Sequence, residues 1–227
     1  MSEHQNQDPT GIEKIEESVL QTEQFLEKNL KLILSVIGVV VIAVGGYFGY
    51  QKFVAEPAAE KAAIALYKAE DKFITGQDSL ALQGEGVAAK GLEAIIKEYS
   101  GSDAANIAQA YKGIALYDAG KYQEAIDALG KYEGKDAYVA PSLKRLQGDA
   151  YSQLGKYQEA AKLYEEAGKQ ADNDAISPSC YIKAGHAYEK LGNKAKALEL
   201  YQMVKDKYYA SPESQSVEAD IIRASAK

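Results

Sequence analysis

Residues 112–129 read KGIALYDAGKYQEAIDAL, residues 147–164 read QGDAYSQLGKYQEAAKLY, and residues 184–201 read AGHAYEKLGNKAKALELY. The three segments align without gaps, and successive copies are 35 and 37 residues apart. Self-similarity at such a period is typical of proteins that stack helical hairpins. One hairpin cannot bury its apolar face alone, so neighbouring copies must stack to form a continuous core. The sequence therefore predicts an all-α solenoid.

Small residues recur at fixed places in each copy and predict a helix, a tight turn and a second helix. The second glycine of each copy is expected at the turn, because glycine adopts the left-handed conformation without a Cβ clash. The first glycine is expected where the two helices approach closely, and the tyrosines fill the wider spaces. The first glycines are Gly113, Gly148 and Gly185, and the second are Gly120, Gly155 and Gly192.

This spacing resembles the tetratricopeptide repeat, whose pattern has Gly-x-x-Tyr in the first helix and Ala-x-x-x-Phe in the second. The matching residues are Gly148, Tyr151, Ala160 and Tyr164 in the second copy and Gly185, Tyr188, Ala197 and Tyr201 in the third. The first copy departs from the pattern with Leu116 and Leu129, and no copy has the early tryptophan of the family. The resemblance covers residues 106–211 and implies a protein-binding solenoid.

Residues 32–50, LILSVIGVVVIAVGGYFGY, form a run of nineteen residues without a charge. A helix of this length spans roughly the 30 Å of bilayer hydrocarbon, so the run predicts a single transmembrane helix. A buried core helix and a cleaved signal peptide are the alternatives. The 31 preceding residues carry a net charge of −4, whereas a signal peptide has a short basic leader, so we expect a retained signal-anchor. Lys28 and Lys31 favour an N-terminus inside the cell.

The chain outside the span divides into four further parts. Residues 1–31 form an acidic tail, in which Ile12, Ile15, Val19, Leu26 and Leu30 give an amphipathic helix a thin apolar stripe. That stripe fits a short coiled coil, a helix on the membrane surface, or a plain extension of the span. We expect a linker helix and a degenerate leading hairpin over residues 51–105, three repeats over residues 106–211, and a capping helix over residues 212–227.

Composition excludes several kinds of function. The net charge of −7 disfavours a nucleic-acid binder, since phosphate contacts need an excess of cations. Cys180 is the one cysteine, and His4 and His186 are the two histidines, so disulfides and zinc cages have too few ligands. Cys180 near His186 is weak evidence for a nucleophile. We therefore expect no enzyme activity, no cofactor and no bound metal ion.

Helical-repeat solenoids bind partners in the groove lined by their first helices. With the repeat register above, the protein-binding groove is predicted to contain Ile107, Ile114, Tyr117, Arg145, Asp149, Ile182, His186 and Glu189. This groove is apolar at one end and mixed in charge at the other, which suits an extended peptide or a partner helix. Some family members clamp C-terminal carboxylates with Lys and Asn, but those positions here hold Ala110, Ile114, Arg145 and Asp149, so a clamp of that kind is not expected. Alternatively, the hairpin within residues 58–99 covers the apolar end.

The layout of acidic tail, single span and repeat solenoid resembles the ancillary subunit family of the bacterial SecYEG translocon. That resemblance implies anchoring in the cell inner membrane, a cytoplasmic N-terminus and a periplasmic repeat domain. It also implies partners such as the translocon, a periplasmic chaperone or exported chains. Our first hypothesis is an adaptor for protein export or chaperoning, and the alternative is a self-associating scaffold that organises an envelope complex.

Overall fold

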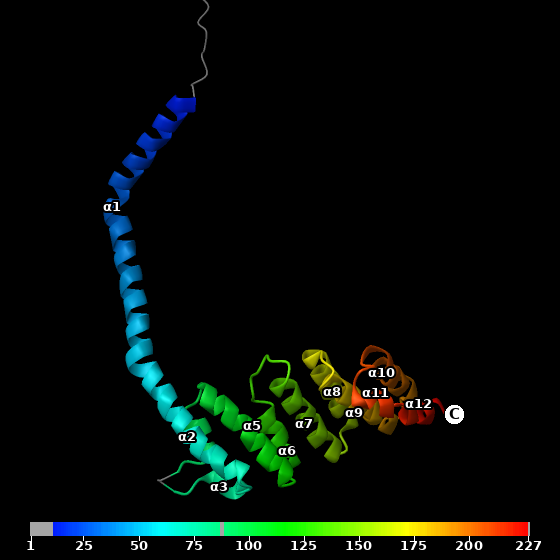
Figure 1. Cartoon of the computed structure of the whole chain (residues 1–227). Helices are drawn as coiled ribbons and strands as arrows, with labels where there is room; N and C mark the ends of the chain where they lie inside the picture. Colours follow the sequence, from blue (N-terminus) through cyan, green and yellow to red (C-terminus); the bar gives the residue numbers. More distant parts are fainter. Residues whose placement is uncertain (1–10, 87–88, 227) are drawn as a thin grey trace, which may run out of the picture. The chain divides into compact units, whose positions relative to one another are not determined.

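The computed structural model describes residues 11–86 and 89–226, and every regular element in these ranges is helical. Gly84 and Lys90 form an isolated β-bridge. The chain divides into two compact units, residues 1–57 and residues 58–227, which are coloured along the sequence in Figure 1. The all-α prediction is confirmed.

The first unit contains the predicted span. Helix α1, Gly11–Tyr50, is followed by a π-helical turn, η1, Gln51–Ala55. The apolar side chains of α1 are exposed, among them Val39 and Ile42. By length and composition this helix could cross a membrane, a property that a signal sequence shares. Residues 1–10 of the predicted acidic tail, and the side chains of Ile12 and Ile15, lie outside the described residues.

The leading hairpin of the second unit consists of α2, Glu56–Ile74, α3, Asp78–Gln83, and α4, Leu92–Glu98. Its core includes Ala62 and Leu66 of α2 and Leu92 and Ile95 of α4. The sequence predicts a leading hairpin here, and in the structure its second arm is divided into α3, before the loop, and the short α4 after it. The loop between α3 and α4 brings two parts of the backbone into close approach. A Cβ at Gly91 would lie 2.4 Å from the carbonyl carbon of Gln83, so only glycine fits at this position.

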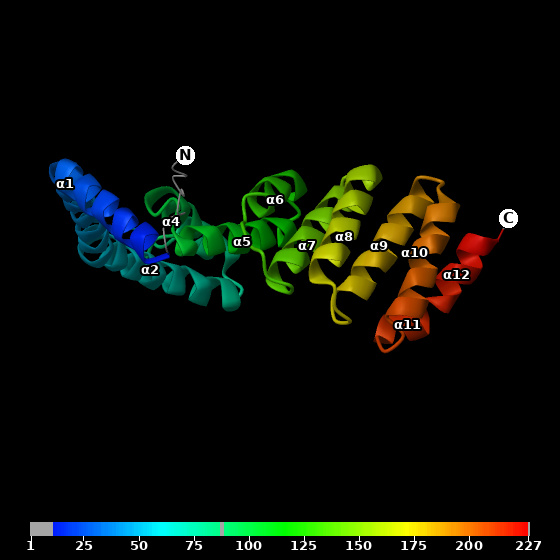
Figure 2. The same ribbon diagram turned by 90° about the horizontal axis from the view of Figure 1, so that it is seen from above.

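Three helical hairpins follow in chain order and stack side by side, as Figure 2 shows from above. The first pair is α5, Asp103–Asp118, and α6, Tyr122–Leu129. The second is α7, Val139–Gln153, and α8, Tyr157–Ala171. The third is α9, Ser177–Lys190, and α10, Lys194–Lys207. Two helices close the described chain, α11, Pro212–Ser216, and α12, Glu218–Ser225.

The turn glycines lie where the sequence predicts them. Gly120, Gly155 and Gly192 have φ angles of 75°, 71° and 76°. Each turn has the two hydrogen bonds of a Schellman motif: in the first, Gly120 N–H donates to Tyr117 O at 2.9 Å and Lys121 N–H to Leu116 O at 2.8 Å. The same glycine chemistry therefore ends α5, α7 and α9.

The first glycines allow the two helices of each hairpin to pack closely. A Cβ at Gly148 would lie 2.7 Å from Cε1 of Tyr164, and one at Gly113 would lie 2.5 Å from Cγ of Leu129. In the third hairpin a Cβ at Gly185 would collide with the ring of Tyr201, which is fully buried. This interlock confirms the sequence interpretation of the small and aromatic positions.

Helix α6 has 8 residues, whereas α8 has 15 and α10 has 14. Gly130 and Gly134 follow its end, and glycine is a poor helix former. Residues 130–138 are instead held by side chains of other elements. Asn106 donates to Glu133 O and accepts from Glu133 N–H, both at 2.8 Å, and Asn173 donates to Ala137 O at 2.9 Å.

Candidate protein-binding groove

The first helices α5, α7 and α9 present the residues that the sequence assigns to a groove, and α12 continues their register. Polar side-chain pairs join α7 to α9 and α9 to α12. In every pair the two residues are 34 positions apart in the sequence. The four pairs are Arg145–Ser179, Asp149–Lys183, His186–Asp220 and Glu189–Arg223. Helix α12 therefore lies beside α9 in the way that α9 lies beside α7, as the first helix of a further repeat would. This register places the predicted groove residues of α7 and α9 along one face.

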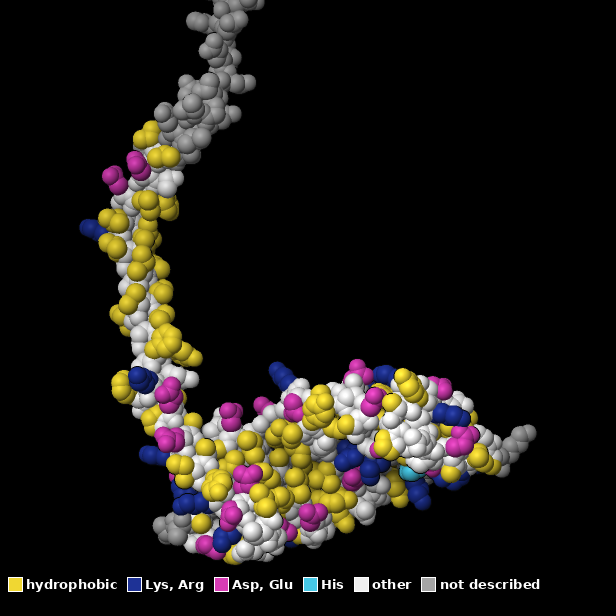
Figure 3. All heavy atoms as spheres, in the orientation of Figure 1, with side chains coloured by type: hydrophobic (Ala, Val, Ile, Leu, Met, Phe, Trp, Pro, Cys, Tyr) yellow, Lys and Arg dark blue, Asp and Glu magenta, His cyan; other side chains and the backbone are white. Residues whose placement is uncertain are grey.

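The apolar half of this face is formed around α5. Ile107 is 41% exposed, and Ile114 is half-buried against the cluster of Leu129 and Leu143. Tyr117 is also half-buried, and its ring centroid lies 5.4 Å from that of Tyr122. In Figure 3 hydrophobic side chains, in yellow, gather over α5 and its neighbours, and Lys and Arg side chains lie between this patch and the cyan histidine.

The leading hairpin packs on a different side of α5 from Ile107. The hairpin shares a buried cluster with Ala104 and Ala108, and Tyr111 donates its hydroxyl to Glu70 of α2. Farther along α5, Leu82 of α3 joins the cluster that includes Tyr117. The hairpin thus packs near one end of the predicted apolar half, while Ile107 remains open to solvent.

The charged half begins at α7. Asp149 accepts a hydrogen bond from the Tyr164 hydroxyl at 2.6 Å and another from Lys183 Nζ at 2.9 Å. Burial, together with the bond to Asp149, raises the pKa of Tyr164 above its ordinary value, so the tyrosine stays a neutral donor. Arg145, one turn earlier on α7, donates from Nη1 to Ser179 Oγ at 3.0 Å.

The predicted residues of α9 have two different surroundings. Ile182 is half-buried against the large C-terminal core cluster. His186 Nε2 lies 3.0 Å from Oδ1 of Asp220, and Glu189 accepts from Arg223 Nη2 at 2.7 Å. The hydrogen bond from Arg223 lowers the pKa of Glu189, so this carboxylate remains charged in the groove. At this end, partners from α12 already hold the charged groove residues.

A cavity of about 410 Å³ lies on the charged half, within the size range of ligand pockets. It brings together three of the predicted residues, Tyr117, Asp149 and His186, from three different helices. Of its other lining residues, Tyr164 was predicted as a repeat-motif residue, and the rest are Ser152, Gln153, Tyr157, Lys183, Ala187 and Lys190. Lys183, Asp220 and Arg223 were not predicted, because the repeats in the sequence are 35 and 37 residues apart and do not mark the 34-residue separation of these pairs.

The described side chains include no metal-binding cluster, and the one cysteine is buried. In residues 11–86 and 89–226 no group of three or more His, Cys, Asp and Glu could hold a metal ion. Cys180 is fully buried, and burial raises the pKa of its thiol to about 11, which disfavours the reactive thiolate. The described side chains of this face form hydrogen bonds, ion pairs and apolar contacts.

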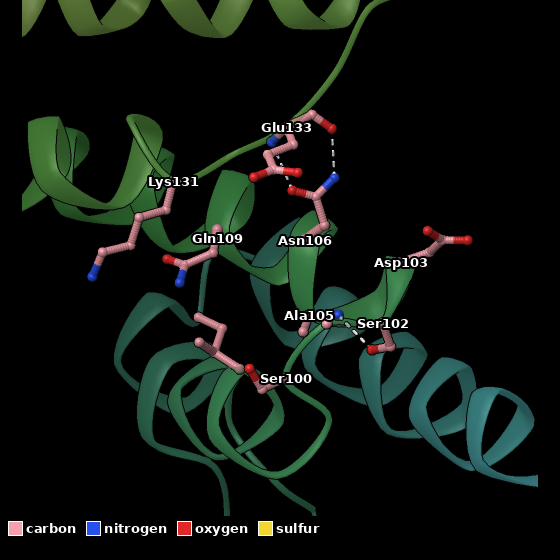
Figure 4. A pocket seen from close by; sticks show the side chains of 10 residues that line it. Ser100, Ser102, Asp103, Ala105, Asn106, Gln109, Lys131 and Glu133 are labelled. Carbon is pink, nitrogen blue, oxygen red and sulfur yellow. Dashed lines mark hydrogen bonds between the residues drawn. The ribbon is translucent and has the colours of Figure 1, made fainter. Parts of the chain in front are cut away.

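A second cavity, of about 350 Å³, lies at the start of α5 (Figure 4). Its walls include Asn106 and Glu133, which bond to each other, and Ser102, whose hydroxyl caps α5 by accepting from Ala105 N–H at 3.2 Å. None of the predicted groove residues lines it. It is therefore separate from the groove, and its hydrogen bonds serve the fold.

Comparison with known proteins agrees with this architecture. The tetratricopeptide repeat family model matches residues 80–140, 112–175 and 145–214. No curated protein sequence matches the chain. A Podosopora anserina protein with nearly identical TPR-like repeats has a similar structure, with a TM-score of 0.56 and 17% identity over 73% of this chain and 86% of that one. The MamA protein is similar at a TM-score of 0.52 and 16% identity, over 73% of this chain and 88% of its own. Because the family model matches more than half of its residues, the chain belongs to the tetratricopeptide repeat family.

Proposed function

We propose that this protein is a membrane-anchored adaptor of the bacterial cell envelope that binds other proteins through the face formed by α5, α7 and α9. The observation that carries the proposal is the exposure of Ile107, 41%, on a first helix whose far end supplies Tyr117 to a cavity of about 410 Å³. An open apolar surface beside polar groups is the usual composition of a peptide-binding site.

The binding mode follows from the composition of the face. An extended segment or an amphipathic helix can place apolar side chains over Ile107 and Ile114 while its polar groups reach Asp149 and His186. Contacts with Asp220 and Arg223 of α12 already engage His186 and Glu189, so we assign most of the affinity to the apolar half.

The location and partners are the finer part of the proposal. The exposed apolar side chains of α1 suit a single membrane span. We assign that span to the inner membrane, with the N-terminus in the cytoplasm, which Lys28 and Lys31 favour, and the repeats in the periplasm. In that arrangement the face would meet exported chains, a periplasmic chaperone or the Sec translocon. The proposed role is assistance in protein export or in periplasmic chaperoning.

Photo-crosslinking of the full chain in its native membranes tests this proposal. A crosslinking amino acid replaces Ile107, and a matched control replaces Ile222, which is 64% exposed on α12 and outside the predicted groove. We expect adducts with translocon subunits, a periplasmic chaperone or exported chains from position 107 and far fewer from position 222. Adducts only with cytoplasmic proteins, or an identical pattern at both positions, would contradict the proposal.

The exposure of Ile222 favours a second candidate, a self-associating scaffold that organises an envelope complex. Helix α12 follows the register of the first helices, so its outer side could receive another helical element. In the same experiment this candidate predicts adducts between copies of the chain from position 222. Self-adducts at position 222 without foreign adducts at position 107 would replace the adaptor by the scaffold.

A further inference from the structure

Arg145 differs from the other paired cations of the groove face. Lys183 has a carboxylate oxygen of Asp149 at 2.9 Å, and Arg223 has one of Glu189 at 2.7 Å. Within the described part of the chain, the recorded hydrogen-bond partner of Arg145 is the neutral hydroxyl of Ser179. Its Nε–H is shielded from solvent and has no hydrogen-bond partner there. A guanidinium carries five N–H donors, and Ser179 takes one of them, so donors remain for a further acceptor.

An under-bonded and partly desolvated guanidinium is unfavourable, because the charge has lost water without gaining a counter-ion. The nearby charges do not remedy this. Asp149, one turn along α7, is engaged by Lys183 and by the Tyr164 hydroxyl. Glu166 lies 3.8 Å from Nζ of Lys144, the residue before Arg145. Among the described residues, no carboxylate therefore acts as a counter-ion of Arg145.

Arg145 also stands at the boundary between the two halves of the face. Leu146, the next residue, packs with Ile114 in the cluster that joins α5 to α7. On the other side Ser179 belongs to α9. A ligand that lies on the apolar half and continues toward α9 must pass the guanidinium.

We propose that Arg145 binds the carboxylate of an aspartate or glutamate in the partner protein. The partner segment then has apolar side chains, which cover Ile107 and Ile114, followed within a few residues by the acidic side chain. A carboxylate can take two parallel N–H donors from one guanidinium, and such charge-assisted pairs are stronger than neutral hydrogen bonds. This inference rests on the proposed function, because it assumes that a protein segment occupies the groove.

Selection from a phage-displayed library of random 12-residue peptides tests the assignment on the full chain in lipid nanodiscs. The wild type is compared with Arg145→Gln, with Arg145→Lys, and with Lys162→Gln as a control whose side chain is 75% exposed on α8. We expect peptides selected by the wild type and the control to be enriched both in apolar residues and in an acid beside them. The acidic enrichment disappears with Arg145→Gln and returns in part with Arg145→Lys.

Direct binding then measures the size of the effect. Replacing the acid of a selected peptide by its amide should weaken binding to the wild type by roughly tenfold, and should leave binding to Arg145→Gln unchanged. Thermal unfolding of each variant shows whether the fold is retained.

The two proposals fail in different ways. Apolar enrichment without an acid, or an acidic enrichment that survives in Arg145→Gln, overturns the role of Arg145 and leaves the groove intact. The selected peptides are also tested on Ile107→Asp. If they bind this variant as tightly as they bind the wild type, the groove proposal itself is overturned. A selection that yields no binding peptide also overturns the groove proposal, and the inference about Arg145 falls with it.

Discussion

The contact between α5 and α7 and the contact between α7 and α9 belong to one repeat architecture but use different chemistry. Ala110 and Ile114 of α5 meet Leu143 and Leu146 of α7 in an apolar cluster. On the groove face between α7 and α9, the corresponding connections are hydrogen bonds and an ion pair, Arg145–Ser179 and Asp149–Lys183. The repeat fold thus fixes where first helices meet, and it leaves open which side chains meet there.

The two kinds of contact differ in what they contribute to stability. Removing a buried leucine side chain leaves a cavity and costs several kcal/mol. An ion pair with partly exposed partners is worth little, because water and salt screen it. The side chains of Lys183 and Asp149 are 39% and 18% exposed. We therefore expect the polar contacts to shape the binding surface while buried apolar and aromatic groups hold the helices together.

Tyr201→Ala should have the largest effect on the free energy of unfolding. Tyr201 lies beneath the charged half, fully buried against Gly185, and donates its hydroxyl to Glu189 at 3.0 Å. We expect a loss of about 3–5 kcal/mol. Urea denaturation of the full chain in detergent measures it, with the 77%-exposed Tyr209→Ala as control. Equal effects of the two changes would show that the interlock does not support this half.

Leu143→Ala tests the apolar contact directly. Leu143 is 7% exposed and packs against Ala110 and Leu129. We expect a loss of about 2–3 kcal/mol, because the neighbouring side chains fill the cavity only in part. The same denaturation series measures it, and the 40%-exposed Leu154→Ala is the matched control. A loss no larger than that of the control would remove the distinction between the two contacts.

Gly155→Ala should cost about 1 kcal/mol, because any side chain at a φ of 71° is strained. Gly120→Ala, in the corresponding turn of the first repeat, should cost the same amount, since both glycines lie in the same motif. Equal losses would show that the repeats share the same turn even though the contacts between their first helices differ. Unequal losses would mean that the turns respond to their surroundings.

Lys183→Gln should lower the free energy of unfolding by less than about 1 kcal/mol. The loss should shrink when the denaturation is repeated in about 1 M salt, which screens the wild-type pair with Asp149. Lys97→Gln, an exposed lysine of α4, serves as control. A loss comparable with that of Leu143→Ala would contradict the view that the polar contacts contribute little.

The smallest effect concerns pH. Arg223 lowers the pKa of Glu189 in the folded protein below its ordinary value of 4.5. The stabilisation from this pair is therefore present above the unfolded pKa and is lost as pH falls through the lower folded pKa. Denaturation midpoints between pH 6 and about pH 3 should decline less steeply for Arg223→Gln than for the wild type. Parallel curves would show that the pair with α12 does not couple to folding.

The glycines and aromatic residues of the repeats allowed much of the fold to be predicted. A left-handed turn or a close helix approach admits few residue types, so Gly120 and Gly148 reveal their structural roles in the sequence. The predicted groove residues Tyr117, Asp149 and His186 do line one cavity. Their use as a binding surface remains a prediction.

Features that depend on long-range contacts could not be predicted in the same way. The division into α3 and α4 depends on the close approach of Gly91 to the backbone of Gln83, and helical pattern does not report such a crossing. The partners of His186 and Glu189 come from α12, which carries no recognisable repeat motif. Charged side chains at a surface have many permissible partners, so their pairing follows only from the folded arrangement.

The shortness of α6 has a consequence for how the solenoid unfolds. A repeat array is stabilised by the intrinsic terms of its repeats and by coupling between nearest neighbours. With 8 residues, α6 offers α7 about half the helical length that α8, with 15, offers α9. Amide side chains such as Asn106 hold the following segment in place of a helical hydrogen-bond ladder. We expect cooperativity to be weakest there, so that hydrogen exchange would separate residues 58–129 and residues 139–226 into two independently opening blocks.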